Sequence, residues 1–226
     1  MSRVRGGTVT RVAGGAAITI AALATLMAPP AGAGTRQADM LSDVAAQTLA
    51  DLRAAQAHRA AVATGREPAG SPEAATAEAV YAGDLGVLAN VVSPRTASAP
   101  DAFVTAWTAA GDTRMTVLLS ALAEVGVPYR RNTSQPGVGF DCSGLTMYAW
   151  SQAGVALPHN DRAQIGVSVR RSWETALAGD LVDYPGHVMM YLGAGHAIVH
   201  APYTGTSVAV TEYGGRRGAT LASPIG

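Results

Sequence analysis

The chain has 226 residues, which is long enough to bury a substantial hydrophobic core in one or two domains. Its 16 basic residues balance its 16 acidic residues, so the sequence offers no electrostatic basis for binding nucleic acid. A single cysteine, Cys142, excludes any disulfide within the chain.

The first 33 residues have the pattern of an export signal. Three Arg precede or begin an uncharged stretch at 12–27 rich in Ala, Ile and Leu, and the small-residue site Ala31-Gly32-Ala33 follows. We predict cleavage after Ala33, which leaves a secreted or cell-wall-associated protein without membrane contact; an uncleaved anchor is the alternative. In an exported chain an unpaired cysteine indicates an intermolecular disulfide or a free reactive thiol, and we favour the thiol.

A helical segment of unknown role is predicted over residues 34–92. Apolar residues recur at helical spacing in 38–64 and 73–92, and the Gly- and Pro-containing stretch 65–72 separates the two helices. We expect them to form a hairpin that packs on itself or on the following domain, because helices with so thin an apolar face need a partner. Residues 93–100 have the composition of a linker.

Residues 101–226 predict an α+β domain. Its first helices are expected through Ala110 and over 114–124, the second one capped by Asp112. Four short strands are expected in the last third, at residues 180–184, 187–192, 195–200 and 206–212.

Cys142 lies where a loop rich in Gly, Pro and Asn meets the start of a predicted helix over 145–153. A cysteine in the first turn of a helix faces unpaired backbone N–H groups and the positive end of the helix dipole, which stabilise a thiolate. Asp141 is the predicted N-cap. Because the thiolate is the attacking form, this position favours a nucleophile, with a small buried structural cysteine as the alternative.

Two histidines are predicted to be neighbours in the sheet. A two-residue turn at 193–194 pairs His187 directly with His200, whereas a four-residue loop leaves them diagonal on the same face. His187 can then take the proton of Cys142 while His200 orients its ring. Zinc is the alternative, but these three residues leave a ligand missing, so we predict no metal and no cofactor. The other histidines are expected to be solvated or less well placed: His58, His159 and His196.

Six motifs in this order resemble the NlpC-type family of bacterial cell-wall cysteine peptidases, which have a papain-like fold. The resemblance covers less than half of the chain and predicts a nucleophile helix packed on an antiparallel sheet. The motifs are GVPY at 126–129, FDCSGL at 140–145, ALP at 156–158, GDLV at 179–182, HVMMYLG at 187–193 and VHAP at 199–202.

The resemblance implies a catalytic role for four residues. Cys142 would be the nucleophile, His187 the general base and acid, and His200 the residue that orients His187. Tyr129 would lie near the thiol and stabilise the oxyanion, where attack on a carbonyl carbon develops negative charge.

The resemblance also implies that Asp141 and Ser143 help to bind substrate, although Asp141 as a helix cap alone is an equal alternative. The chain departs from the family at residues 130–132, where Arg-Arg-Asn replaces the common Trp-Gly-Gly. The segment 183–186 is also short, which would leave one rim of the cleft less covered.

We therefore expect a secreted cysteine endopeptidase that hydrolyses peptidoglycan stem peptides through a thioester on Cys142. The resemblance points to the bond between D-Glu and a diamino acid such as meso-diaminopimelate. An amidase or acyltransferase of the same fold is the first alternative, and a non-catalytic wall-binding module is the second. The helices in 34–92 are expected to contact the catalytic domain and to shield its cleft until they are processed.

Overall fold

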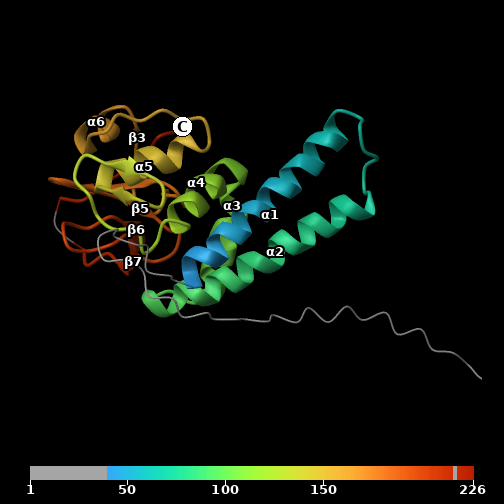
Figure 1. Cartoon of the computed structure of the whole chain (residues 1–226), viewed down its shortest axis with the longest axis horizontal. Helices are drawn as coiled ribbons and strands as arrows, with labels where there is room; N and C mark the ends of the chain where they lie inside the picture. The colour runs from blue at the N-terminus through green and yellow to red at the C-terminus, as the bar shows by residue number, and fades with distance from the viewer. Residues whose placement is uncertain (1–39, 216–217) are drawn as a thin grey trace, which may run out of the picture. The chain divides into compact units, whose positions relative to one another are not determined.

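The computed structural model describes residues 40–215 and 218–226, so the predicted export signal at 1–33 lies outside the described residues. The described residues form one compact unit of helices and an antiparallel sheet (Figure 1). None of the helices in this part of the chain is long and apolar enough to cross a membrane. The predicted α+β class, with a helical segment before the sheet, is confirmed.

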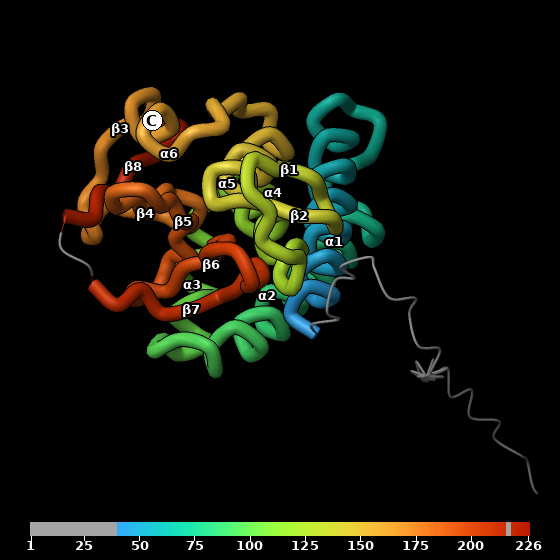
Figure 2. Tube along the Cα trace, turned by 60° about the vertical axis from the view of Figure 1, so that its left-hand side comes forward, coloured from blue at the N-terminus to red at the C-terminus, as the bar shows by residue number. Residues whose placement is uncertain are grey.

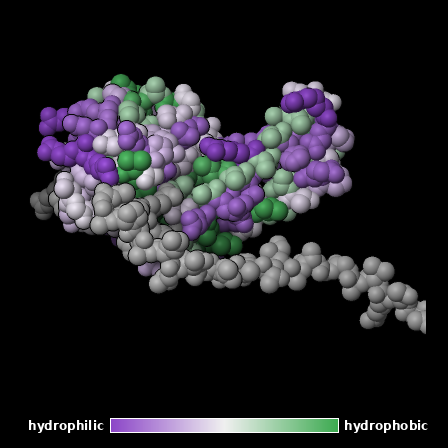
Figure 3. All heavy atoms as spheres, viewed as in Figure 1, coloured by the Kyte–Doolittle hydropathy of each residue, from purple (hydrophilic) through white to green (hydrophobic). Residues whose placement is uncertain are grey.

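The two predicted N-terminal helices form a hairpin, α1 (Met40–Ala63) and α2 (Pro72–Val92). Ser71 caps α2 because its hydroxyl accepts the N–H of Ala74 at 3.1 Å. The loop end of the hairpin is hydrophilic, whereas the rest of the surface seen in Figure 3 mixes both kinds of residue. The apolar residues that the hairpin buries include Leu41, Leu52, Leu85 and Leu88.

Two further helices, α3 (Pro100–Ala110) and α4 (Asp112–Leu122), follow. The prediction that Asp112 caps α4 is wrong, because the helix begins at Asp112 and Gly111 precedes it with φ 78° and no side-chain bond. The carboxylate of Asp112 instead accepts a hydrogen bond from Nη2 of Arg59 in α1 at 2.6 Å.

The predicted linker at 93–100 is folded onto the sheet. It contains the 3-10 helix η1 (Ser93–Arg95), and the N–H of Ala97 donates to Oε2 of Glu212 at 3.1 Å. Pro100 already begins α3, so the chain passes from the hairpin to the domain without an extended connector. The domain boundary near residue 100 stays a prediction.

Two buried side chains, one on α3 and one on α4, make polar contacts that connect these helices with the sheet. The indole N–H of Trp107 donates to the carbonyl oxygen of Leu192 at 2.7 Å. The Arg114 guanidinium bonds Asp180 at 2.6 Å and the hydroxyl of Ser223 at 2.7 Å. One hydrophobic core therefore extends from the hairpin, through these helices, to the sheet.

The sheet has six antiparallel strands in the order β3-β8-β4-β5-β6-β7, and the helix that begins at Cys142 packs on β5. The four predicted strands are present, while β3, β8, the β1–β2 hairpin and α6 were missed. Figure 2 shows the β1–β2 hairpin beside α5. The elements are β1 (Ser134–Gln135), β2 (Gly139–Phe140), α5 (Cys142–Ser151), α6 (Asp161–Gly166), β3 (Val169–Arg171), β4 (Leu181–Tyr184), β5 (His187–Tyr191), β6 (Ala197–His200), β7 (Ala209–Glu212) and β8 (Thr220–Ser223).

Just beyond the end of β5, the N–H of Leu192 donates to the carbonyl oxygen of Ala197 at 2.9 Å, so the loop of this β-hairpin has four residues, 193–196. The pairs Met190–Val199 and Tyr191–Ile198 shift the register by two from the one that a two-residue turn gives, so that turn is wrong and the four-residue alternative is right. Two glycines with positive φ within the loop permit the longer path.

Candidate active site

Cys142 opens α5, and Asp141 caps it as predicted. The Oδ1 atom of Asp141 accepts the N–H of Gly144 at 2.7 Å. Burial raises the pKa of the half-buried Cys142 thiol, while backbone hydrogen bonds from Val188 and Ser143 act in the opposite direction. The backbone groups at the helix start thus favour the thiolate, but burial has the larger effect on the pKa of Cys142.

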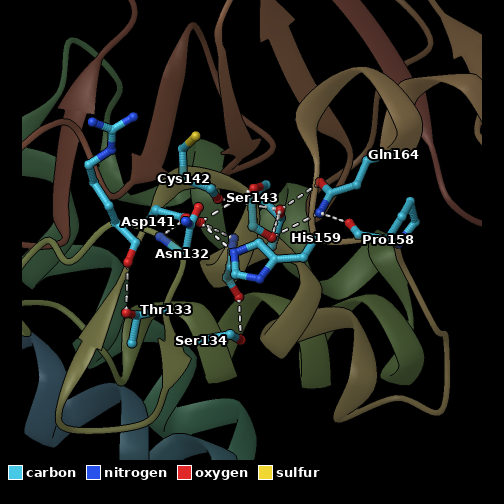
Figure 4. A network of polar contacts seen from close by, with 12 residues as sticks. Asn132, Thr133, Ser134, Asp141, Cys142, Ser143, Pro158, His159 and Gln164 are labelled. Atoms are coloured by element: carbon cyan, nitrogen blue, oxygen red, sulfur yellow. Dashed lines mark hydrogen bonds and ion pairs between the residues drawn. The ribbon is translucent and has the colours of Figure 1, made fainter.

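The Asp141 carboxylate is the centre of a polar cluster (Figure 4). Besides the Gly144 N–H, Oδ1 binds Nε2 of His159 at 2.8 Å and accepts the hydroxyl of Ser143 at 3.3 Å. Oδ2 accepts the N–H of Asn132 at 2.7 Å. His159 is exposed to solvent, as expected, but its ring also bonds a carboxylate that is only 7% exposed, a contact that the sequence did not predict.

Gly144 allows the preceding loop to press against the first turn of α5. A Cβ atom at this position would overlap the carbonyl oxygen of Thr133 and lie 3.0 Å from Oδ1 of Asp141. The hydroxyl of Ser134 donates to the Gly144 carbonyl at 2.8 Å, and Asn132 has φ 50°, in the left-handed region. The close approach explains why the motif carries glycine after the nucleophile turn.

Gln164, from the missed helix α6, supports the same turn from the other side. Its fully buried amide donates to the carbonyl oxygens of Ser143 at 2.8 Å and Pro158 at 2.9 Å. Its Oε1 accepts the hydroxyl of Thr146 at 2.7 Å. Figure 4 shows these bonds beside the Asp141 cluster, so the start of α5 is fixed from two directions.

His187 and His200 are joined by a hydrogen bond. Nε2 of His187 lies 2.9 Å from Nδ1 of His200, and their ring centroids are 5.1 Å apart. Burial, reinforced by the neighbouring His187, lowers the pKa of His200 to about 4, so His200 is neutral near pH 7. Because the hydrogen bond to Cys142 comes from Val188, the next residue along β5, the histidine pair is at the thiol end of the sheet.

A cleft of about 320 Å³ opens at the thiol. Burial and the nearby Cys142 and Asp141 raise the pKa of Tyr129, so its hydroxyl stays protonated and can donate a hydrogen bond. The structure thus brings Tyr129 to the thiol, as the resemblance implies, while the functional roles of the site residues stay predictions. The cleft is lined by Tyr129, Arg131, Asn132, Asp141, Cys142, Ser143, His159, Asn160, Asp161 and Gly186.

Comparison with known proteins agrees with this geometry, because residues 126–218 match the NlpC/P60 family. This part of the chain is similar to NlpC/P60 domains. A probable endopeptidase of Mycobacterium tuberculosis is 38% identical over 104 residues, which cover 45% of this chain and 26% of that protein. The bifunctional muramidase/DL-endopeptidase CwlT of Bacillus subtilis is 40% identical over 88 residues, 35% of this chain and 27% of that protein.

The chain thus spans about a quarter of the length of these two curated relatives, both of which are named as endopeptidases. Solved structures with this domain include the P60 domain of the M. avium subspecies paratuberculosis antigen MAP1204, which is 26% identical with a TM-score of 0.45 and covers 50% of this chain and 96% of that chain. RipD from M. tuberculosis, described as non-catalytic and adapted to peptidoglycan binding, is 26% identical with a TM-score of 0.42 and covers 49% of this chain and 95% of that chain.

Sequence reasoning missed two polar residues that shape the NlpC/P60 site, His159 and Gln164. Both follow Leu157-Pro158 in a stretch with no clear periodicity, and their partners in α5 and its cap lie 18 or more positions earlier in the chain. Asn160 capping α6 three residues before Ala163 is the one local signal that could have revealed the short helix. Within the described residues, no three His, Cys, Asp or Glu side chains are grouped as a metal site requires.

Proposed function

We propose that the protein is a secreted cysteine endopeptidase that cuts peptidoglycan stem peptides between D-Glu and the diamino acid. The observation that carries the proposal is the half-buried thiol of Cys142 at the start of a helix, at the end of the sheet where His187 and His200 are hydrogen-bonded. A buried thiol with a raised pKa does not ionise readily alone, and a histidine base supplies what it lacks.

In the proposed reaction, His187 takes the proton of Cys142 as the sulfur attacks the scissile carbonyl carbon. The Tyr129 hydroxyl donates to the oxyanion of the tetrahedral intermediate. The His187 imidazolium then gives its proton to the leaving amine, and a thioester remains on Cys142. Water, deprotonated by His187, hydrolyses the thioester and restores the thiol.

His200 has a positioning role in this proposal. Since it is neutral near pH 7, its Nδ1 can accept the Nε2–H of His187, which leaves Nδ1 of His187 as the nitrogen that exchanges the proton. The same bond stabilises the imidazolium that forms during attack.

Asp141 is proposed to position the nucleophile rather than to bind substrate. Its two oxygens already accept hydrogen bonds from several donors, including the N–H groups of Gly144 and Asn132. Figure 4 shows the Cys142 sulfur pointing away from this cluster. Ser143 donates to Asp141 and is only 7% exposed, which favours the same role for it.

The test uses the mature chain from residue 34 and its Cys142→Ala variant, each incubated with peptidoglycan fragments of known stem composition. Mass spectrometry should find stem peptides cut at the D-Glu bond by the wild type only. Products that carry an amine or lipid in place of water would favour an acyltransferase. Intact fragments together with a thiol inert to alkylating agents would overturn the proposal and leave a non-catalytic wall-binding domain.

A further inference from the structure

Arg131 lines the cleft with a positive charge that is not paired with any carboxylate in the described part of the chain. Its guanidinium makes no hydrogen bond or ion pair with any residue in 40–215 or 218–226, although it lines the same cleft as Cys142. By contrast, Arg59 and Arg114 both bind carboxylates of the protein.

The backbone around Arg131 is fixed even though the side chain is exposed. The Arg131 carbonyl oxygen accepts the hydroxyl of Thr133 at 3.0 Å, and the next N–H, that of Asn132, donates to Asp141 at 2.7 Å. The guanidinium is therefore carried by a rigid wall of the cleft. Its positive charge offsets part of the rise in the pKa of Tyr129, which places it within electrostatic range of the proposed oxyanion donor.

The negative groups of the cleft do not neutralise this charge. Asp141 is bonded to its own cluster, and the carboxylate of Asp161 accepts the N–H of Arg162 at 2.8 Å at the start of α6. A substrate that enters the cleft thus meets one unpaired cation beside Tyr129. A carboxylate is its best partner, because the guanidinium fork matches a carboxylate with two parallel hydrogen bonds.

We propose that Arg131 binds the free carboxylate of the acidic residue that contributes the scissile carbonyl, so the enzyme selects stems in which this group is a carboxylate over stems in which it is a carboxamide. This inference rests on the proposed function. A D-Glu residue has two carboxyl groups, and whichever one forms the cleaved bond leaves the other free close by. Arg131 lies in the segment 130–132, where the chain has Arg-Arg-Asn in place of the common Trp-Gly-Gly. We therefore expect this selectivity in the present chain and not in relatives that have Trp-Gly-Gly in this segment.

The test compares two synthetic stem peptides that are identical except for a carboxylate or a carboxamide on the D-Glu residue. We expect wild-type kcat/KM to be about 10- to 100-fold higher for the carboxylate peptide, as a charge-assisted bond suggests. Arg131→Gln should lower only the carboxylate value and bring the ratio near one. Arg131→Lys should keep an intermediate ratio, because it retains the charge but not the fork.

Arg130→Gln is the matched control. Arg130 is also exposed, but its side chain lies across Gly139 and is not part of the cleft lining, so the variant should keep the wild-type ratio. A wild-type ratio near one, or an unchanged ratio in Arg131→Gln, would overturn the inference and leave the proposed function standing. Failure of the wild type to cut either peptide would overturn both.

Discussion

The α1–α2 hairpin and the first turn of α5 are both helical, yet different interactions hold them in place. The hairpin buries an apolar seam that includes Leu52 and Leu88, whereas the ion pairs of its Arg59 lie on the surface. Arg59 pairs there with Glu78 and Asp112, with all three side chains 40–47% exposed. At the start of α5 the polar groups are buried and bonded to one another.

Because of this difference, we expect mutations in the hairpin to change mainly the stability of the protein, and mutations around Asp141 to change mainly the position of the thiol. Exposed ion pairs contribute about 0–1 kcal/mol each, so the hairpin depends on apolar burial and tolerates polar changes. A buried polar group left without a partner costs about 1–3 kcal/mol, so the cluster around Asp141 tolerates few changes. We infer that the hairpin sets how stable the protein is, while the Asp141 cluster sets where the thiol lies.

Removing the carboxylate of Asp141 should have the largest effect. Asp141→Ala takes away the cap of α5 and leaves His159 and the N–H of Asn132 without their acceptor. We expect kcat/KM on stem peptides to fall at least about 100-fold, because small displacements of a nucleophile are costly. The free energy of unfolding should fall by about 2 kcal/mol. Asp112→Ala is the control for loss of an acidic side chain in a first turn, and it should keep full activity.

Shortening a buried leucine of the hairpin should have the opposite signature. Leu88→Ala is expected to lower the free energy of unfolding by about 2–4 kcal/mol, measured with denaturant, because it leaves a cavity in the core. Its kcat/KM should match the wild type at temperatures well below the melting transition. A loss of activity without a loss of stability would contradict this inference, because it would show that the hairpin affects the cleft.

The histidine pair predicts how acid affects the site. The pKa of His200 is about 4 in the folded protein and about 6.5 when unfolded, so the unfolded chain binds more protons between these values. His200 should therefore cost the protein stability as the pH falls from about 6.5 to 4. Activity should also be lost near pH 4, where a charged His200 no longer accepts the bond from His187. In His200→Asn, urea titrations across this range should show a smaller loss of stability.

A substitution of Asp183 should have the smallest effect on stability. Unlike Asp141, this carboxylate is not surrounded by hydrogen-bond donors from residues 40–215 and 218–226. Its buried Oδ1 has no hydrogen-bond partner in the described part of the chain, and burial, with the charge of Asp161, raises its pKa to about 6. Because the folded state holds this proton more tightly, Asp183 makes the protein less stable as the pH rises from about 4 to 6 and beyond.

Asp183→Asn removes this charge and should raise Tm by about 2–4 °C at pH 7.5. It should have little effect at pH 4.5, where the wild-type carboxyl is protonated. Equal shifts at both pH values would show that the charge is not the cause.

Local patterns in the sequence were sufficient to predict helices α1 to α5 and the Asp141 cap. The same patterns placed the cysteine at a helix start and the two histidines on one face. They failed where the outcome depends on distant partners. Nothing near His159 indicates that its acceptor is Asp141, and the buried role of Gln164 depends on a six-residue helix. The sequence at 193–194 predicted a two-residue turn, but the pairing of Leu192 with Ala197 gives a four-residue loop.

The most direct test of the central claim is to trap the acyl-enzyme. The mature wild-type protein and Cys142→Ala would be mixed with a stem peptide, quenched in acid within milliseconds to seconds, and measured intact by mass spectrometry. We predict a wild-type adduct with the mass of the acyl part of the peptide, localised by digestion to the fragment that contains Cys142 and absent from the variant. Stem cleavage by Cys142→Ala, or rapid turnover with the adduct on another residue, would contradict the assignment of Cys142 as the nucleophile.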